Sequence, residues 1–78
     1  MSDPAPIVDL ADKSVSHAGT TYAIRPLGDD AYTALVEGIP VGKLVYTFGA
    51  AMGVPEGTAV SEETLTLVAE AWFAALDA

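Results

Sequence analysis

The sequence of 78 residues contains no cysteine and only three basic residues, Lys13, Arg25 and Lys43. Without cysteine the chain has no disulfide bond and no thiolate that could bind zinc or attack a substrate. Nucleic-acid phosphates and anionic membrane surfaces are bound mainly by lysine and arginine. With 11 acidic residues and a net charge of −8, the chain is therefore not expected to bind either of them directly.

Long apolar runs are also absent. No stretch approaches the length of about 20 apolar residues that a membrane span requires. The opening segment MSDPAPIVDLADK lacks the basic start and the continuous apolar stretch of a signal peptide. We therefore expect a cytoplasmic protein, with residues 1–12 as a flexible acidic tail and residues 13–78 as one small domain.

Residue patterns that support catalysis or metal binding are missing as well. His17 is the single histidine, and in a strand its side chain points to the opposite face from Ser16, so the two do not form a catalytic pair. Asp29 and Asp30 are adjacent carboxylates without the oxygen-rich loop of a calcium site. No dinucleotide-binding or P-loop pattern occurs. We expect no enzymatic activity, no cofactor and no bound metal.

The middle of the chain is rich in β-branched and aromatic residues and predicts an antiparallel sheet. The expected strands are residues 14–17, 20–27, 31–36 and 39–47, with turns at Ala18-Gly19, Gly28-Asp30 and Glu37-Gly38. A bulge at Gly42 is an open alternative, because one extra residue would exchange the faces of all side chains that follow it.

The C-terminal segment predicts a helix over residues 62–77. Ser61 is a suitable N-cap, and Glu62 and Glu63 follow it in the first turn, where the helix dipole favours acidic residues. One apolar stripe at helical spacing consists of Leu65, Val68, Ala69, Trp72 and Leu76. Strands followed by a helix predict an α+β domain, in which the helix packs on one face of a three- to four-stranded antiparallel sheet.

The uncharged segment between the expected sheet and helix is ambiguous. A short helical turn over residues 48–52 is expected there, because Gly53 followed by Pro55 is a common helix stop. A longer helix from Lys43 to Met52 is the alternative, although Val45, Thr47 and Gly49 disfavour it.

Apolar surface is expected to contact another chain, since 51% of the residues are hydrophobic in a domain with little interior. The candidate residues are Leu67, Ala71 and Ala74 on the far side of the helix, together with Tyr46 near the end of the last expected strand and Phe48 and Met52 after it. Aromatic and methionine side chains are enriched at interfaces. The alternative is that Tyr46, Phe48 and Met52 form the core under the helix.

Charged residues supply two further candidates. Glu63, Glu70 and Asp77 recur at steps of seven and form an acidic stripe along the helix, which is either a solvated face or a mimic of nucleic-acid phosphates. Arg25 either pairs with a carboxylate of the same chain or holds a carboxylate of a partner.

The sequence thus favours a non-enzymatic, small acidic module that binds protein, as a homodimer or as an accessory subunit of a larger assembly. One alternative is a phage-type acidic inhibitor that mimics nucleic acid in the groove of a basic enzyme. Another alternative is a small-ligand-binding domain.

Overall fold

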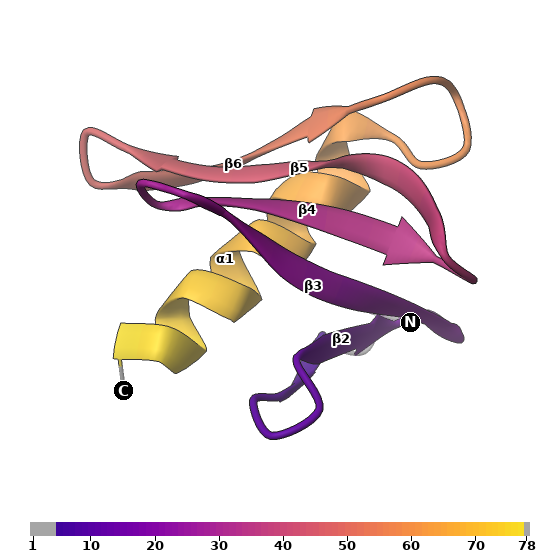
Figure 1. Cartoon of the computed structure of the whole chain (residues 1–78), viewed down its shortest axis with the longest axis horizontal. Coiled ribbons are helices and arrows are strands. Elements are labelled where there is room, and N and C mark those ends of the chain that lie inside the picture. Colours follow the sequence, from indigo (N-terminus) through magenta and orange to yellow (C-terminus); the bar gives the residue numbers. More distant parts are fainter. Residues whose placement is uncertain (1–4, 78) are drawn as a thin grey trace.

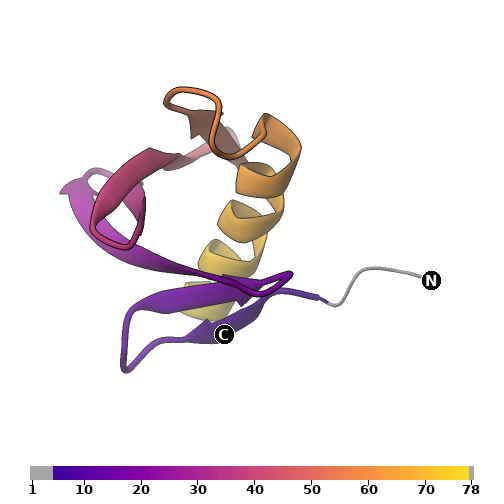
Figure 2. The ribbon, with the colours of Figure 1, turned by 90° about the vertical axis from the view of Figure 1, so that its right-hand side faces the viewer.

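The computed structural model describes residues 5–77 and consists of one antiparallel sheet curled around one helix (Figure 1). The elements are β1 (Ile7–Asp9), β2 (Ser14–His17), β3 (Thr20–Gly28), β4 (Ala31–Val36), β5 (Ile39–Thr47), β6 (Ala50–Pro55) and α1 (Glu62–Asp77). Each strand pairs with its neighbour in sequence. Figure 2 shows α1 inside the curve of the sheet, so the sheet has a concave face against the helix and a convex face that no other element of residues 5–77 covers. The part of the expected tail before residue 5 lies outside the described residues.

The sheet has six strands, so the expectation of three to four was wrong, although the α+β class holds. One of the additional strands, β1, lies within the segment assigned to the tail. It has three residues, too few for an alternating pattern to be recognised in the sequence. It forms because Val8 pairs with Val15 of β2 and packs against the core.

The expected helical turn over residues 48–52 was also wrong, because Ala50–Pro55 forms β6 along the edge of β5. Phe48 and Gly49 form a two-residue hairpin turn with φ angles of 53° and 77°. Such turns usually begin with asparagine, aspartate or glycine, so Phe-Gly gave little indication of a hairpin. Gly53, which was interpreted as part of a helix stop, lies inside the strand.

The bulge that the sequence left open as an alternative is present in β5. Val41 and Gly42 together oppose Ala34 of β4. The extra residue exchanges the faces of the residues that follow it. Val41 and Leu44 therefore both point into the core, and Leu44 is fully buried.

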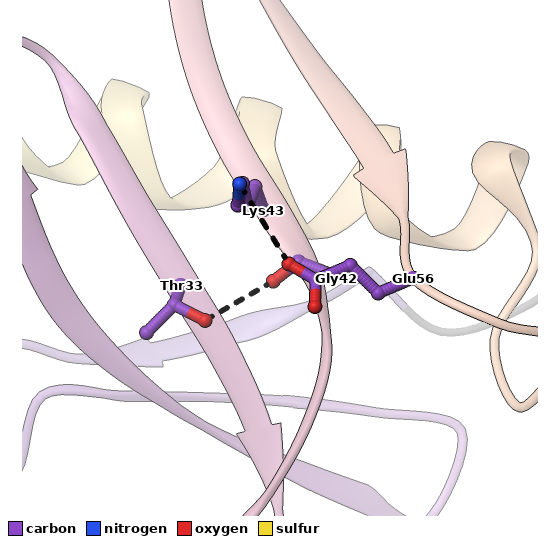
Figure 3. A network of polar contacts seen from close by, with 4 residues as sticks. All are labelled: Thr33, Gly42, Lys43 and Glu56. Carbon is purple, nitrogen blue, oxygen red and sulfur yellow. Dashed lines mark hydrogen bonds and ion pairs between the residues drawn. The ribbon is translucent and has the colours of Figure 1, made fainter.

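The carbonyl groups of this bulge have one partner on β4 and one directly after β6. The Thr33 hydroxyl donates a long hydrogen bond of 3.4 Å to the carbonyl of Gly42 (Figure 3). The backbone N–H of Glu56 donates to the carbonyl of Val41 at 3.0 Å. Beside them, Lys43 Nζ lies 4.0 Å from Glu56 Oε1, which extends the contact between β5 and the end of β6.

The helix begins and ends where the sequence predicted. Ser61 Oγ accepts a hydrogen bond of 3.2 Å from the backbone N–H of Thr64 and so caps the first turn. The buried side of the helix consists of Leu65, Val68, Ala69 and Trp72. These residues pack on the concave sheet face, where the buried side chains include Val15, Tyr22, Ile24, Ala34, Val41 and Leu44.

Two glycines let the helix approach β5 and β6 closely. A Cβ on Gly53 would meet the backbone of Leu65 and Thr66, and a Cβ on Gly42 would meet the Leu65 side chain. Thr66 Oγ1 accepts a hydrogen bond of 3.2 Å from the backbone N–H of Gly53, a strand group that faces away from β5. This close contact fixes the first turns of α1 against β5 and β6.

Candidate functional site

A groove of about 630 Å³ lies between the C-terminal half of α1 and the β5–β6 hairpin. Ligand-binding pockets commonly fall between about 300 and 1,000 Å³. Small residues of the hairpin and of α1 contribute to the lining and leave this space open. The distinctive side chains are three aromatic rings and three carboxylates: Tyr32, Tyr46, Phe73, Asp30, Glu70 and Asp77.

The aromatic rings of the groove form a continuous row. The Phe73 ring centroid lies 5.5 Å from that of Tyr32 and 5.3 Å from that of Tyr46, with interplanar angles of 67° and 48°. Behind this row, Trp72 of the core contacts Tyr32 edge-on at 5.5 Å. Such tilted and edge-on pairs are favoured by the charge distribution of aromatic rings. Tyr32 and Phe73 are half-buried and Tyr46 is 44% exposed, so packing against the core orients a ring surface that solvent still reaches.

Helical spacing explains the helix side of the groove. Glu70, Phe73, Ala74 and Asp77 are three, four and seven positions apart, and such residues share one side of a helix. That side faces the hairpin because Thr66, one turn earlier, is bound to β6. The helix therefore places one ring and two carboxylates along one wall.

The third carboxylate comes from the turn between β3 and β4. Asp29 and Asp30 have φ angles of 34° and 59°, a conformation that aspartate adopts more readily than most residues. The backbone N–H of Tyr46 donates to the carbonyl of Asp30 at 3.1 Å. This bond holds the turn against β5 and brings Asp30 to the groove.

Charge is distributed unevenly between the two sides of the molecule. Asp30, Glu70 and Asp77 are exposed, and within residues 5–77 none of them forms an ion pair. In contrast, Arg25 and Lys43 lie on the convex face of the sheet, on either side of Thr33. The groove is therefore acidic and separated from Arg25 and Lys43, whereas the third cation, Lys13, lines a neighbouring hollow that shares Tyr32 and Leu76 with the groove.

Phe48 stands next to the groove at the tip of the β5–β6 hairpin. Its side chain is fully exposed, and the following Gly49 lines the groove. A φ of 53° is unusual for a bulky residue, which costs about 1–2 kcal/mol in this region. Neither core packing nor turn geometry accounts for phenylalanine at this position.

The structure brings some of the expected site residues together and separates others. The groove includes Tyr46, Ala74, Glu70 and Asp77, with Phe48 beside it. Met52 lies on the convex face opposite Val45. Leu67, Ala71 and Glu63 lie on α1 but outside the lining of the groove.

Sequence reasoning missed two residues of the groove. Asp30 was interpreted as part of a turn without a metal site, and Tyr32 only as part of a strand. Both are about 40 positions from the helical residues they approach. Only the pairing of β4 with β5 and the packing of α1 bring them together, and no local pattern indicates that arrangement.

A second hollow, of about 590 Å³, lies at the start of α1. His17 lines it and is only 8% exposed, at the end of β2 beside the Ala18-Gly19 turn. Within residues 5–77 its Nδ1 atom has no hydrogen-bond partner. Ser61 and Thr64 also line the hollow, but their hydroxyl groups are 3.1 Å apart and take part in the helix cap. The alternative function named above, a small-ligand-binding domain, can be tested at this hollow.

Comparison with known proteins gives no match to a family model, to a curated protein or to a solved structure. In the described part of the chain, no group of three or more His, Cys, Asp or Glu side chains is arranged to hold a metal ion, and this includes the carboxylates of the groove. Over the same residues, no helix is both long enough and apolar enough to cross a membrane.

Proposed function

We propose that the protein is a small, non-enzymatic module that binds another protein through the groove and through Phe48 beside it. The observation that supports this most directly is the fully exposed Phe48 ring, held at a positive φ beside a groove that contains three partly exposed aromatic side chains. Aromatic residues are enriched at protein interfaces and often supply most of their binding energy. The module acts as a homodimer or as an accessory subunit of a larger assembly, and the proposed compartment is the cytoplasm.

Photo-crosslinking tests the position of the interface. The photoreactive residue p-benzoylphenylalanine replaces Phe48 in one variant and Ile39 in the control. Ile39 is also an exposed apolar residue, but it lies at the opposite end of β5. Mass spectrometry of the crosslinked products from cells identifies the partner, and we expect a product that depends on position 48 alone.

Titration of the purified partner then measures the contribution of Phe48. The variant Phe48→Ser is expected to weaken binding by about tenfold or more, as is typical of an aromatic hot spot. Ile39→Ser is expected to leave the affinity unchanged. Equal effects of the two variants would contradict a docking surface at the groove.

Light scattering after size-exclusion chromatography tests the homodimer. If the mass doubles as the concentration rises from micromolar to millimolar, and Phe48→Ser abolishes the change, the partner is a second copy. A monomer over the whole range excludes the homodimer and leaves the accessory subunit.

The acidic inhibitor remains a second candidate, because Asp30 joins Glu70 and Asp77 of the acidic stripe at one groove. It predicts salt-sensitive binding to a basic enzyme and competition with the DNA or RNA of that enzyme. The double variant Glu63→Lys with Glu70→Lys tests it. If this variant still competes with DNA or RNA as strongly as the unmodified protein, the acidic stripe does not mimic nucleic-acid phosphates.

A further inference from the structure

The lining of the groove combines negative charge with aromatic surface, and this combination restricts what can occupy it. We infer that the groove receives a lysine or arginine side chain from a basic segment of a partner polypeptide. The inference rests on the proposed function, since it names the chemistry of the occupant of the same groove.

Charge is the first argument. Asp30, Glu70 and Asp77 are exposed and form no ion pair within residues 5–77. An apolar or acidic partner surface would remove water from these carboxylates without replacing its hydrogen bonds, which is costly. A cationic side chain supplies both the opposite charge and the N–H donors that carboxylates bind most strongly. The net charge of −8 further attracts basic partners over a longer range.

The aromatic row is the second argument. Tyr32, Phe73 and Tyr46 provide a surface for the alkyl stem of lysine or arginine, which packs on apolar groups while its head stays polar. The electron-rich faces of aromatic rings also attract ammonium and guanidinium groups. A hydrated metal ion uses neither property, and in the described residues these carboxylates are not arranged as a metal site.

A second copy of the chain is a poor source of this side chain. The whole sequence has 3 basic and 11 acidic residues, so two copies repel each other at long range. One of the two cations on the convex face, Lys43, already lies beside Glu56. The inference therefore specifies a different polypeptide with a basic segment.

Short peptides provide direct probes. Blocked tetralysine and blocked tetra-arginine are titrated into the ¹⁵N-labelled full-length chain, with tetralysine acetylated on every side chain as the uncharged control of equal length. Both basic peptides are expected to shift the amide signals of Gly49, Ala51 and Ala74, and the effect is expected to weaken as NaCl is raised. Binding of the acetylated peptide with equal affinity, or shifts centred elsewhere, would overturn the inference.

Matched variants separate a specific site from general attraction to an acidic protein. Glu70→Gln with Asp77→Asn is expected to weaken tetralysine binding by about fivefold or more, since each exposed ion pair contributes modestly. Glu62→Gln with Glu63→Gln changes the net charge equally on the same helix and is expected to have little effect. If the two double variants weaken binding equally, the attraction is not specific to the groove and the inference is wrong.

The ring is tested separately. Tyr46→Leu keeps every charge and is expected to weaken binding by about two- to fivefold through the lost cation–π contact. Unchanged affinity would contradict the aromatic part of the inference, provided that circular dichroism shows the variant to be folded. Spermine, a free polyamine, is the probe for a cation that does not belong to a polypeptide. If spermine binds more tightly than tetralysine, the inference that the cation comes from a polypeptide is wrong.

The failure of this inference can be distinguished from the failure of the proposed function. If the crosslinked partner depends on Phe48 but contacts the groove without lysine or arginine, the proposed function stands and this inference fails. If tetralysine binds specifically but Phe48→Ser leaves partner binding intact, the groove is confirmed as a site for basic side chains and the proposed docking mode fails.

Discussion

Gly53 of β6 lies so close to Leu65 of α1 that a Cβ on Gly53 would meet both the backbone and the Cβ of Leu65. The neighbouring backbone N atom of Thr66 would be in contact as well. Backbone atoms cannot rotate away as a flexible side chain can. The absence of a side chain at position 53 therefore sets the distance between the helix and the edge of the sheet.

Gly53→Ala is expected to destabilise the protein by about 1–3 kcal/mol, the usual range for overpacking. Gly42→Ala is expected to destabilise it as well, because a Cβ there would meet the Leu65 side chain and would lie 2.8 Å from the backbone oxygen of Val54. Denaturant unfolding measures both variants. Thr47→Ala, at an exposed position of β5, is the control and should change stability by less than about 0.5 kcal/mol. A Gly53→Ala variant as stable as the unmodified protein would contradict the close contact.

Thr66→Val is expected to lower the free energy of unfolding by about 1–3 kcal/mol, because it removes the acceptor of the Gly53 N–H and leaves that part-buried donor without a partner. Thr66→Ser retains the hydroxyl and should retain most of the stability. Hydrogen exchange at the Gly53 amide provides a local measurement. Faster exchange in the valine variant than in the serine variant is expected, and equal rates would show that the bond contributes little.

Phe48→Asn is expected to stabilise the fold by about 1 kcal/mol, because asparagine tolerates the positive φ of the turn and the exposed ring makes no core contact to lose. The same variant should weaken partner binding. Glu37→Asn is the matched control, because Glu37 occupies the corresponding position of the β4–β5 turn with a φ of 52°. It should raise the unfolding temperature to a similar extent without affecting binding. A loss of stability in Phe48→Asn would contradict the strained turn.

Alkaline pH is expected to destabilise the protein through Tyr22, which is 3% exposed. Burial raises the pKa of Tyr22 above its usual value of 10.0, because the interior disfavours the charged phenolate. Above that usual value the unfolded chain loses the proton before the folded chain does, so stability is fully present below about pH 10 and falls as pH rises towards the folded pKa. Tyr22→Phe should show a smaller decline than Tyr46→Phe when unfolding is measured across this range. Parallel declines would contradict the prediction.

The sequence predicted most of the elements that have strong local patterns. The helix from Glu62 to Asp77 and the strands Ser14–His17, Ala31–Val36 and Ile39–Thr47 agree with the expected bounds. β6 was missed because Gly53 and Pro55 usually terminate helices. In this fold Gly53 is required by contact with the helix, a tertiary constraint that no window of sequence contains.

The candidate site was predictable only in part, for a similar reason. Glu70 and Asp77 follow from helical spacing, and Tyr46 and Phe48 from their aromatic character in an uncharged segment. Asp30 requires knowledge of the hairpin geometry. The exposure of Phe48 depends on its place in a turn, whereas the sequence pattern placed it in a short helix.

The chain order of the elements has a consequence for folding. Every strand pairs with the next one in sequence, so the sheet can assemble through successive short hairpins. The helix that covers its concave face follows all six strands. During synthesis, the apolar side chains of that face therefore remain in contact with water, or with a chaperone, until Glu62–Asp77 has been made and docks. The core is therefore completed by a segment that follows all six strands in sequence.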